Sequence, residues 1–203
     1  MSEIRTPVQK RSIEKRNKII EKGFELMCSQ GYYNTNTSDI ATFANVSTGI
    51  IYQYFKDKKE IFIEGIKKYS DHIMFPILDL LKQKKIGLEH LEQLLDEMLQ
   101  IFIKTHTLSK KAHEEMIALS HLDDEIAAIF HDREMDTTNQ IVQVLQKNGF
   151  YYSDLPEKVH IMIGIVENYC HEVVYHKHSR LDYNLMKKEV IHIIMILLNE
   201  EAN

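Results

Sequence analysis

Apolar residues recur along most of the chain at intervals of three and four, the spacing that places side chains on one face of an α-helix. Alternating apolar and polar residues between turn clusters, which would indicate strands, do not occur. With 7 glycines and 3 prolines in 203 residues, little interrupts the helical pattern. The pattern predicts an all-α protein of about nine helices. They cover residues 10–30, 37 to about 44, 48–54, 57 to about 74, 88–106, 110–122, 123–148, 155–176 and 182–200.

Capping residues mark several of these helix ends. Thr37 is suited to be the N-cap of the second helix, and Asp57 followed by Glu60 is a capping box that opens the fourth. Gly31 and Gly149 are suited to end the helices that precede them, because glycine readily adopts the left-handed conformation of a helix terminus.

Residues 35–62 are predicted to form two short helices, a tight turn between them, and the start of a long helix. Asn45 lies in the turn and tolerates a left-handed backbone, and Ser47 caps the second short helix. Two short helices joined by such a turn form a helix-turn-helix unit, whose second helix enters the major groove of DNA.

The second helix of this unit has one face available to DNA. Ile51 and Phe55 must point inward to form a core, which leaves the other side for base edges and phosphates. Gln53 is the best candidate for direct readout, because its amide can pair with adenine through two hydrogen bonds. The residues predicted on the outer face are Thr48, Gly49, Tyr52 and Gln53.

Residues 16–62, about a quarter of the chain, resemble the signature of the tetracycline-repressor (TetR) family. The resemblance is carried by Asp39-Ile40-Ala41, by the run 44–49, by Tyr52-Gln53-Tyr54-Phe55 with Lys58, and upstream by Ile19-Ile20, Phe24 and Gly31-Tyr32. Lys22 and Gly23 depart from it, because small alanines are usual there, and Asn45 replaces the common turn glycine.

The resemblance implies a DNA-binding head followed by a ligand-binding and dimerising body, with the boundary placed between residues 56 and 57. The head would be residues 1–56 and the body residues 57–203. It also implies phosphate or base contacts from Thr37, Ser47, Thr48, Gly49, Tyr52, Tyr54 and Lys58. Thr37 and Lys58 lie near helix N-termini, where backbone amides and the helix dipole favour phosphate. In the arm, residues 1–9, Arg5 is a further candidate for DNA contact, although a solvated tail is at least as common.

The last two predicted helices are apolar on more than one face, so they need burial on two sides. One side belongs to the core of the body. In the TetR family the last two helices of each chain form a four-helix dimer interface, and their position here fits that use; burial within the chain's own core is the alternative. The residues predicted at the interface are Ile161, Ile165, Tyr169, Val173, Ile191, Ile194, Met195 and Leu198.

The bodies of TetR proteins commonly hold a small-molecule pocket, whose residues vary too much to be carried over. Candidates are residues of aromatic, methionine or histidine character on inward stripes, although each such residue is more often plain core. The set predicts an apolar or aromatic effector. It comprises His72, Phe75, Phe102, His106, Met116, His121, Phe130 and Tyr169.

Charge is unevenly distributed. Residues 1–60 carry a net charge of +3 and residues 61–203 a net charge of −8, which suits a protein whose head alone meets phosphate.

Cys28 and Cys170 lie in helical apolar stretches and are expected to be buried free thiols. The chain has no apolar run long enough to span a bilayer and its start is too polar for a signal peptide, so a cytoplasmic protein without membrane contact is expected.

Catalytic and metal-binding patterns are weak. His171 and His176 are five apart and so do not share a helix face as zinc ligation requires, and no nucleophile motif or phosphate loop is present. Asp124, His131 and Glu134 are a remote metal alternative. We therefore expect neither an enzyme nor a metal or other cofactor.

The predicted function is transcriptional repression by a homodimer that a small effector releases from a palindromic operator. Pro76 lacks an N–H and clashes with the carbonyl four residues earlier, so it is expected to kink or stop the fourth helix near Met74. That helix is the natural lever between effector and DNA. The alternative is a nucleoid- or division-associated helix-turn-helix protein without an effector.

Overall fold

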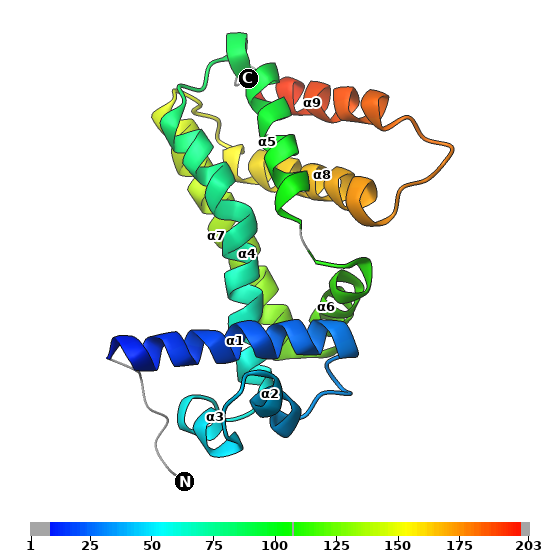
Figure 1. Ribbon diagram of the computed structural model, residues 1–203. Coiled ribbons are helices and arrows are strands. Elements are labelled where there is room, and N and C mark those ends of the chain that lie inside the picture. Colours follow the sequence, from blue (N-terminus) through cyan, green and yellow to red (C-terminus); the bar gives the residue numbers. More distant parts are fainter. Residues whose placement is uncertain (1–8, 107, 200–203) are drawn as a thin grey trace. The chain divides into compact units, whose positions relative to one another are not determined.

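The computed structural model describes residues 9–106 and 108–199. Over these residues the chain forms nine α-helices and one short 3₁₀ helix without any strand, which confirms the all-α prediction (Figure 1). The elements are α1 (Lys10–Gln30), α2 (Thr37–Phe43), α3 (Thr48–Tyr54), α4 (Lys58–Gln83), η1 (Leu88–His90), α5 (Leu91–Thr105), α6 (Lys110–Leu122), α7 (Asp124–Lys147), α8 (Leu155–Tyr175) and α9 (Tyr183–Asn199). The predicted arm, with Arg5, lies outside the described residues except for Gln9.

The chain divides into two compact units. Unit 1 comprises Met1–Ser70 and Leu108–Phe130, and unit 2 comprises Asp71–Thr107 and His131–Asn203. Helices α4 and α7 therefore each contribute residues to both units. The grouping places α6 with the helix-turn-helix, because α6 packs on α1. The functional boundary between residues 56 and 57 stays a prediction.

Unit 1 is built on α1, which packs against α2 and α6, while α2 packs against α3 (Figure 1). Close approach of α1 depends on Gly23, because a Cβ there would lie 2.7 Å from a methyl of Ile61. Gly65 serves the same purpose on α4, where a Cβ would lie 2.4 Å from the ring of Phe24. The departure from alanine at Gly23 is thus explained by packing. The buried residues include Ile19, Ile20, Phe24, Met27, Ile40, Ile51, Phe55, Ile61, Phe62, Met116 and Leu119.

The N-cap of α2 is Asn36, so the prediction that Thr37 caps this helix is wrong by one residue. The side-chain oxygen of Asn36 accepts hydrogen bonds from the backbone N–H groups of Ser38 and Asp39 at 2.9 and 3.0 Å. The carboxylate of Asp39 accepts in return from the N–H of Asn36 at 2.9 Å. Asn36 is the N-cap because Asp39, three positions after it, completes the reciprocal pair of hydrogen bonds of a capping box.

The predicted capping arrangement at the start of α4 is present in modified form. The N–H of Glu60 donates to the carboxylate of Asp57 at 3.0 Å, as expected. The carboxylate of Glu60 reaches one residue further back and accepts from the N–H of Lys56 at 2.7 Å. Both bonds satisfy backbone donors that the first turn of a helix leaves open.

Pro76 does not end α4, which continues to Gln83, so a stop near Met74 is wrong. The proline removes the hydrogen bond to the carbonyl of His72. Both residues lie on the exposed side of the helix, where that carbonyl can bond water, and the residues after Pro76 bury Ile77 and other apolar side chains. Burial of the following turns outweighs the loss of one backbone bond.

Unit 2 is formed by α5, α8 and α9, which pack on one another, together with the adjoining parts of α4 and α7. Lys187 on α9 donates to Asp96 on α5 at 2.5 Å, and Arg133 pairs with Asp71.

Cys170 lies in the core of unit 2 and Cys28 in the core of unit 1, both as free thiols, as predicted. Burial raises the pKa of each thiol to about 12, which keeps it protonated. Within the described part of the chain, no helix has the length and apolar character needed to cross a bilayer.

Candidate DNA-contact surface and ligand cavity

The turn between α2 and α3 has the geometry of a helix-turn-helix. Asn45 adopts φ 55°, as predicted, and the N–H of Val46 bonds the carbonyl of Ala41 at 2.9 Å. These features end α2 and start α3 with only four residues, 44–47, between the two helices, which is the tight connection that the motif requires.

The exposed face of α3 is the one the sequence predicts. Ile51 and Phe55 are fully buried, whereas Gly49, Tyr52 and Gln53 are exposed and Thr48 is half-buried. The core contacts of the first two residues fix the rotation of the helix about its axis. The orientation is therefore confirmed, while contact of these residues with DNA stays a prediction.

Gly49 lies on open surface. A Cβ at this position would meet only the Oγ of Ser47, at 4.0 Å, so packing within the chain does not require glycine here. Glycine nevertheless weakens a helix relative to alanine. An exposed helical glycine on the face predicted to meet DNA is consistent with a close approach of the backbone to phosphate or base.

Two residues of the predicted DNA set make their contacts within unit 1. Tyr54 is buried, and its ring lies edge-on to that of Phe55 at 6.5 Å. The ammonium of Lys58 donates to the carbonyls of Tyr32 and Thr35 at 2.6 and 2.7 Å and lies 4.4 Å from the centre of the Tyr32 ring. Burial lowers the pKa of Lys58. These contacts support a role in holding the loop before α2, which sequence spacing alone does not reveal.

The two remaining members of that set lie at helix starts. Thr37 is the first residue of α2 and is half-buried, and Ser47 is the exposed N-cap residue of α3 without a side-chain capping bond. The hydroxyl of Ser47 is therefore not used by its own helix. Both residues stay predicted phosphate contacts.

Unit 2 contains a partly open apolar cavity of ≈ 60 Å³. Its walls come from α4, α5, α7, α8 and α9, and three of the lining residues are methionines. The space holds a few water molecules or a small apolar group, and methionine walls can repack around something larger. The lining consists of Met74, Ile77, Leu95, Met98, Phe102, Ile141, Val159, Met162, Ile163, Val166, Glu167 and Ile194.

Glu167 is the only polar residue in that lining. Burial, and secondarily the negative charge of Glu134, raise the pKa of the Glu167 carboxyl to about 7. Glu134 lies on α7, where His160 approaches its carboxylate at 3.5 Å. The cavity therefore contains a carboxyl group that is partly charged at neutral pH.

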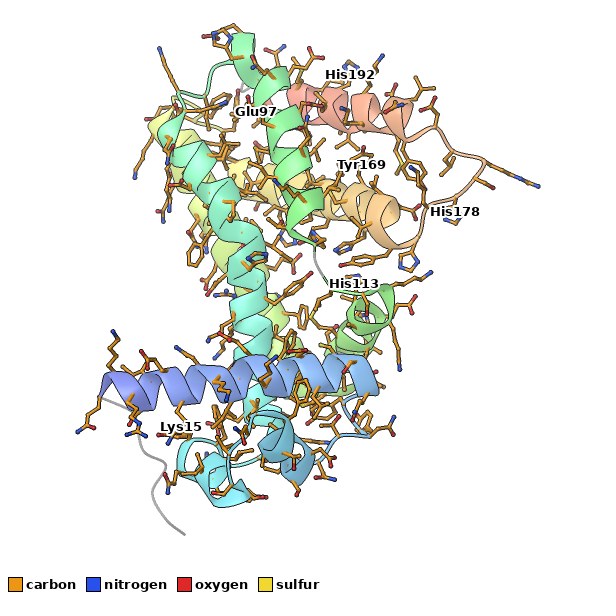
Figure 2. All side chains as sticks on the ribbon, in the orientation of Figure 1. Lys15, Glu97, His113, Tyr169, His178 and His192 are labelled. Atoms are coloured by element: carbon orange, nitrogen blue, oxygen red, sulfur yellow. The ribbon has the colours of Figure 1, made fainter. Side chains whose placement is uncertain are left out.

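Of the eight predicted ligand residues, only Phe102 lines this cavity. His106 stacks on it at 4.5 Å and donates from Nδ1 to its carbonyl at 2.6 Å, and burial lowers the pKa of the imidazole. Tyr169 is buried in unit 2, where its hydroxyl donates to the carbonyl of Tyr183 at 3.3 Å (Figure 2). The others lie away from the cavity: His72 and Phe75 are exposed on α4, and Met116, His121 and Phe130 belong to unit 1.

Sequence reasoning missed Glu167, although the chain contains a signal. Glu167 lies four residues after Ile163 and one after Val166, on the apolar stripe of α8. A carboxylate at such a position is costly unless it has a partner or a purpose. The predicted ligand set does not include Glu167, because it comprises only aromatic, methionine and histidine residues.

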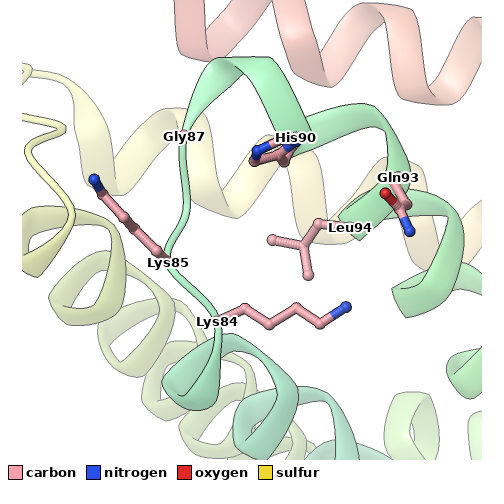
Figure 3. A pocket seen from close by; sticks show the side chains of 6 residues that line it. All are labelled: Lys84, Lys85, Gly87, His90, Gln93 and Leu94. Carbon is pink, nitrogen blue, oxygen red and sulfur yellow. The ribbon is translucent and has the colours of Figure 1, made fainter.

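A second hollow, of ≈ 340 Å³, lies at the connection between α4 and α5. Lys84 and Lys85 line it, but their side chains point in opposite directions from the chain and do not converge on one point (Figure 3). Lys84 also pairs with the carboxylate of Glu97. This hollow is a polar surface feature and not a formed anion site.

Histidines are scattered through the described residues. His178 follows α8 and His192 lies on α9 (Figure 2). Among residues 9–106 and 108–199, no three His, Cys, Asp or Glu side chains gather in a way that could hold a metal ion, and the alternative site at Asp124, His131 and Glu134 gains no support.

The predicted dimer residues fall into two groups. Tyr169, Ile191, Ile194 and Leu198 are buried in the core of unit 2, where they serve the chain's own packing. Ile161 is 53% exposed, and Ile165, Val173 and Met195 are partly exposed. The same helices expose Leu185, Ile193 and Ile196, which the prediction did not include.

The fold and the exposed face of α3 define a helix-turn-helix protein of the DNA-binding class. The sequence model of the family described as "Bacterial regulatory proteins, tetR family" matches residues 19–64. Residues 19–64 therefore match the DNA-binding segment of this family, which agrees with the resemblance seen in the sequence and with a helix-turn-helix of the kind that transcriptional regulators carry.

Two curated relatives and one solved structure illustrate the similarity. The HTH-type transcriptional regulator HbdR of Aromatoleum sp. (strain CIB) is 47% identical over 58 residues, which are 29% of this chain and 25% of HbdR. The Fatty acid metabolism regulator protein of Bacillus subtilis (strain 168) is 29% identical over 91 residues, 45% of this chain and 47% of that protein. The matches thus span half or less of these relatives.

A TetR-family transcriptional regulator from Mesorhizobium loti has the same fold over nearly its full length. Its crystal structure aligns with a TM-score of 0.68 at 20% identity, covering 94% of this chain and 98% of that one. Likeness at this level of identity concerns the fold, so the ligand and operator of this chain have to be argued from its own residues.

Proposed function

We propose that this protein is a homodimeric repressor that occupies a palindromic operator and leaves it when a small, largely apolar ligand enters the cavity of unit 2. The observation that carries the proposal is the exposed face of α3, held in place by fully buried Ile51 and Phe55. A helix anchored in this way presents a fixed set of groups to the major groove.

The proposed DNA contacts combine base readout with phosphate binding. Gln53 is the proposed base reader, and the exposed backbone at Gly49 allows α3 to approach DNA closely. The residues proposed to bind phosphate or base edges beside them are Thr37, Ser47, Thr48 and Tyr52. Tyr54 and Lys58 are proposed to act indirectly, through the packing of unit 1.

The proposed dimer uses the exposed apolar side of α8 and α9. Ile161 and Ile165 lie on one side of α8, with Gly164 between them, and a Cβ at Gly164 would meet nothing within 4 Å. A glycine between exposed Ile161 and partly exposed Ile165 permits close approach of a partner helix. On α9, Ile193 and Ile196 are exposed as well. Apolar surface of this kind is costly to leave in water, which supports burial against a second copy.

The proposed release mechanism acts on helices that serve both functions. The cavity is lined by Met74 and Ile77 of α4 and by Ile141 of α7, and both helices also contribute residues to unit 1. Within unit 1, Lys59 at the start of α4 pairs with Asp123 at 3.1 Å, so α4 is tied to the start of α7. A ligand that repacks the cavity favours one arrangement of these helices and thereby shifts the population that fits the operator.

Selection of duplexes from a random pool tests the proposal. The expected result is enrichment of an inverted repeat, because a two-fold symmetric dimer requires two related half-sites. Gln53→Ala should relax the preference at one base position per half-site, whereas Gln30→Ala, an exposed glutamine at the end of α1, should leave it unchanged. A protein that is monomeric at micromolar concentration and selects no sequence would overturn the proposal.

A further inference from the structure

We infer that the ligand of the unit 2 cavity carries a positively charged amine on an apolar body, and that Glu167 binds the amine. This inference rests on the proposed function in one respect, that the cavity is where the effector binds. It adds the chemical class of the ligand.

The position of Glu167 carries the inference. It is the only polar residue among twelve that line the cavity, and the others are aliphatic, methionine or phenylalanine side chains. Ile163 lies one helical turn before it on α8 and lines the same space. The carboxylate is therefore placed in a wall where packing alone would call for an apolar residue.

The carboxyl group has no cation of its own among the described residues. The two influences on its pKa are burial and the charge of Glu134 on α7; both raise it, to about 7, and neither a hydrogen bond nor a basic side chain lowers it. The charged group that acts on Glu167 from a neighbouring helix is Glu134 of α7, whose carboxylate His160 of α8 approaches at 3.5 Å. Glu167 is half-buried, and a carboxylate partly removed from water without a cation beside it is unfavourable, so a cation that enters the cavity gains a specific contact.

The remaining lining selects the rest of the ligand. Apolar walls favour an alkyl or aromatic body, and an anionic ligand would meet a negative charge. The cavity of ≈ 60 Å³ is small. Its lining includes Met74, Met98 and Met162, and their unbranched side chains can rearrange to enlarge it. The ligand that fits this lining places an ammonium group beside Glu167 and a short carbon chain among the methionines.

Three probes of equal length test the charge selection: hexylamine, hexan-1-ol and hexanoate. Calorimetric titration of the full chain without DNA should show the tightest binding for hexylamine. Because the amine stays protonated between pH 6 and pH 8 while the Glu167 carboxyl loses its proton, affinity for hexylamine should rise about tenfold over this range. Affinity for hexan-1-ol should fall slightly or stay constant.

Variants assign the effect to one residue. Glu167→Gln should abolish the preference for amine over alcohol and its pH dependence, while retaining hexan-1-ol binding as a sign of an intact cavity. Glu157→Gln removes the same charge from an exposed position of α8 and should behave as the original protein. Glu134→Gln should retain the preference but move the pH midpoint of amine binding below 7, because Glu134 raises the pKa of Glu167.

Equal or tighter binding of hexan-1-ol or hexanoate by the unaltered protein would overturn the inference, as would an amine preference that survives Glu167→Gln. Release from the selected operator is measured separately. Selective amine binding that leaves operator binding unchanged would uphold the inference and contradict the effector part of the proposed function. If only uncharged compounds released the protein from the operator, the effector part of the proposed function would be upheld and the inference of an amine ligand would be contradicted.

Discussion

The backbone N–H of Tyr32 donates a hydrogen bond to the carboxylate of Glu115, although the two residues are 83 positions apart in the chain. Tyr32 lies in the loop between α1 and α2, and Glu115 lies on α6. The bond connects the loop that leads into the helix-turn-helix to a helix far along the sequence. It explains in part why α6 belongs to unit 1.

Removing this carboxylate should loosen the loop before α2. Glu115→Ala leaves the N–H of Tyr32 without its partner, and we expect a loss of about 1–3 kcal/mol in the free energy of unfolding. Glu114→Ala, which removes an exposed carboxylate 3.7 Å from Lys110, should cost less than about 0.5 kcal/mol. Urea unfolding measures both. Equal effects of the two variants would show that the bond contributes little.

Gly49→Ala should separate folding from DNA binding. The new methyl group meets open space and alanine favours helix, so stability should be unchanged or rise by about 0.5–1 kcal/mol. Operator affinity should fall, because the methyl group keeps the backbone of α3 away from DNA. Thermal unfolding and fluorescence anisotropy measure the two effects. Gly65→Ala is the contrast, since its methyl group would overlap the ring of Phe24 and lower stability. Undiminished operator binding by Gly49→Ala would remove this residue from the contact surface.

Lys58→Ala should act on stability more than on phosphate binding. The variant leaves the carbonyls of Tyr32 and Thr35 without their donor, so we expect a loss of about 1–3 kcal/mol. The slope of log affinity against log salt concentration should change by less than about one, because the ammonium is already occupied. A slope reduced by one full unit would instead show that Lys58 turns to phosphate when DNA binds.

The proposed dimer should depend on exposed apolar residues of α8. Ile161→Glu places a charge on a side chain that is 53% exposed, so the chain should fold but sediment as a monomer at micromolar concentration. Leu122→Glu alters a side chain that is 71% exposed in unit 1 and should leave the dimer intact. Analytical ultracentrifugation distinguishes the two. Dimerisation of Ile161→Glu with the original affinity would place the interface elsewhere.

Glu167 should give stability a distinctive pH dependence. Its pKa in the folded protein, about 7, lies above the ordinary glutamic acid value of 4.5, so between these pH values the folded protein holds a proton that the unfolded chain releases. Stability contributed by the neutral acid is therefore lost as pH rises from about 4.5 through 7. At pH 8, Glu167→Gln should be more stable than the original protein by about 1–3 kcal/mol. Below pH 4.5 this advantage should vanish.

The control for this pH profile is again Glu157→Gln, which changes an exposed carboxylate on the same helix. Its stability difference from the original protein should not vary between pH 5 and pH 8. A flat profile for Glu167→Gln as well would mean that the Glu167 carboxyl is hydrated and titrates as an ordinary glutamic acid.

The sequence by itself determined the helices and the outward face of α3. The helices Lys10–Gln30, Thr48–Tyr54 and Lys110–Leu122 have the predicted bounds, because their apolar spacing and flanking residues act within a few turns of the backbone. The inward placement of Ile51 and Phe55 follows from the same local periodicity.

Tertiary structure alone decided which distant residues meet. The ammonium of Lys58 binds loop carbonyls, Glu115 reaches back to Tyr32, and five helices bring Glu167 to the wall of a cavity. The continuation of α4 through Pro76 depends likewise on burial of the turns that follow. Periodicity states which face of a helix is buried but not which other helix covers it, since that choice is made by packing between segments far apart in the chain.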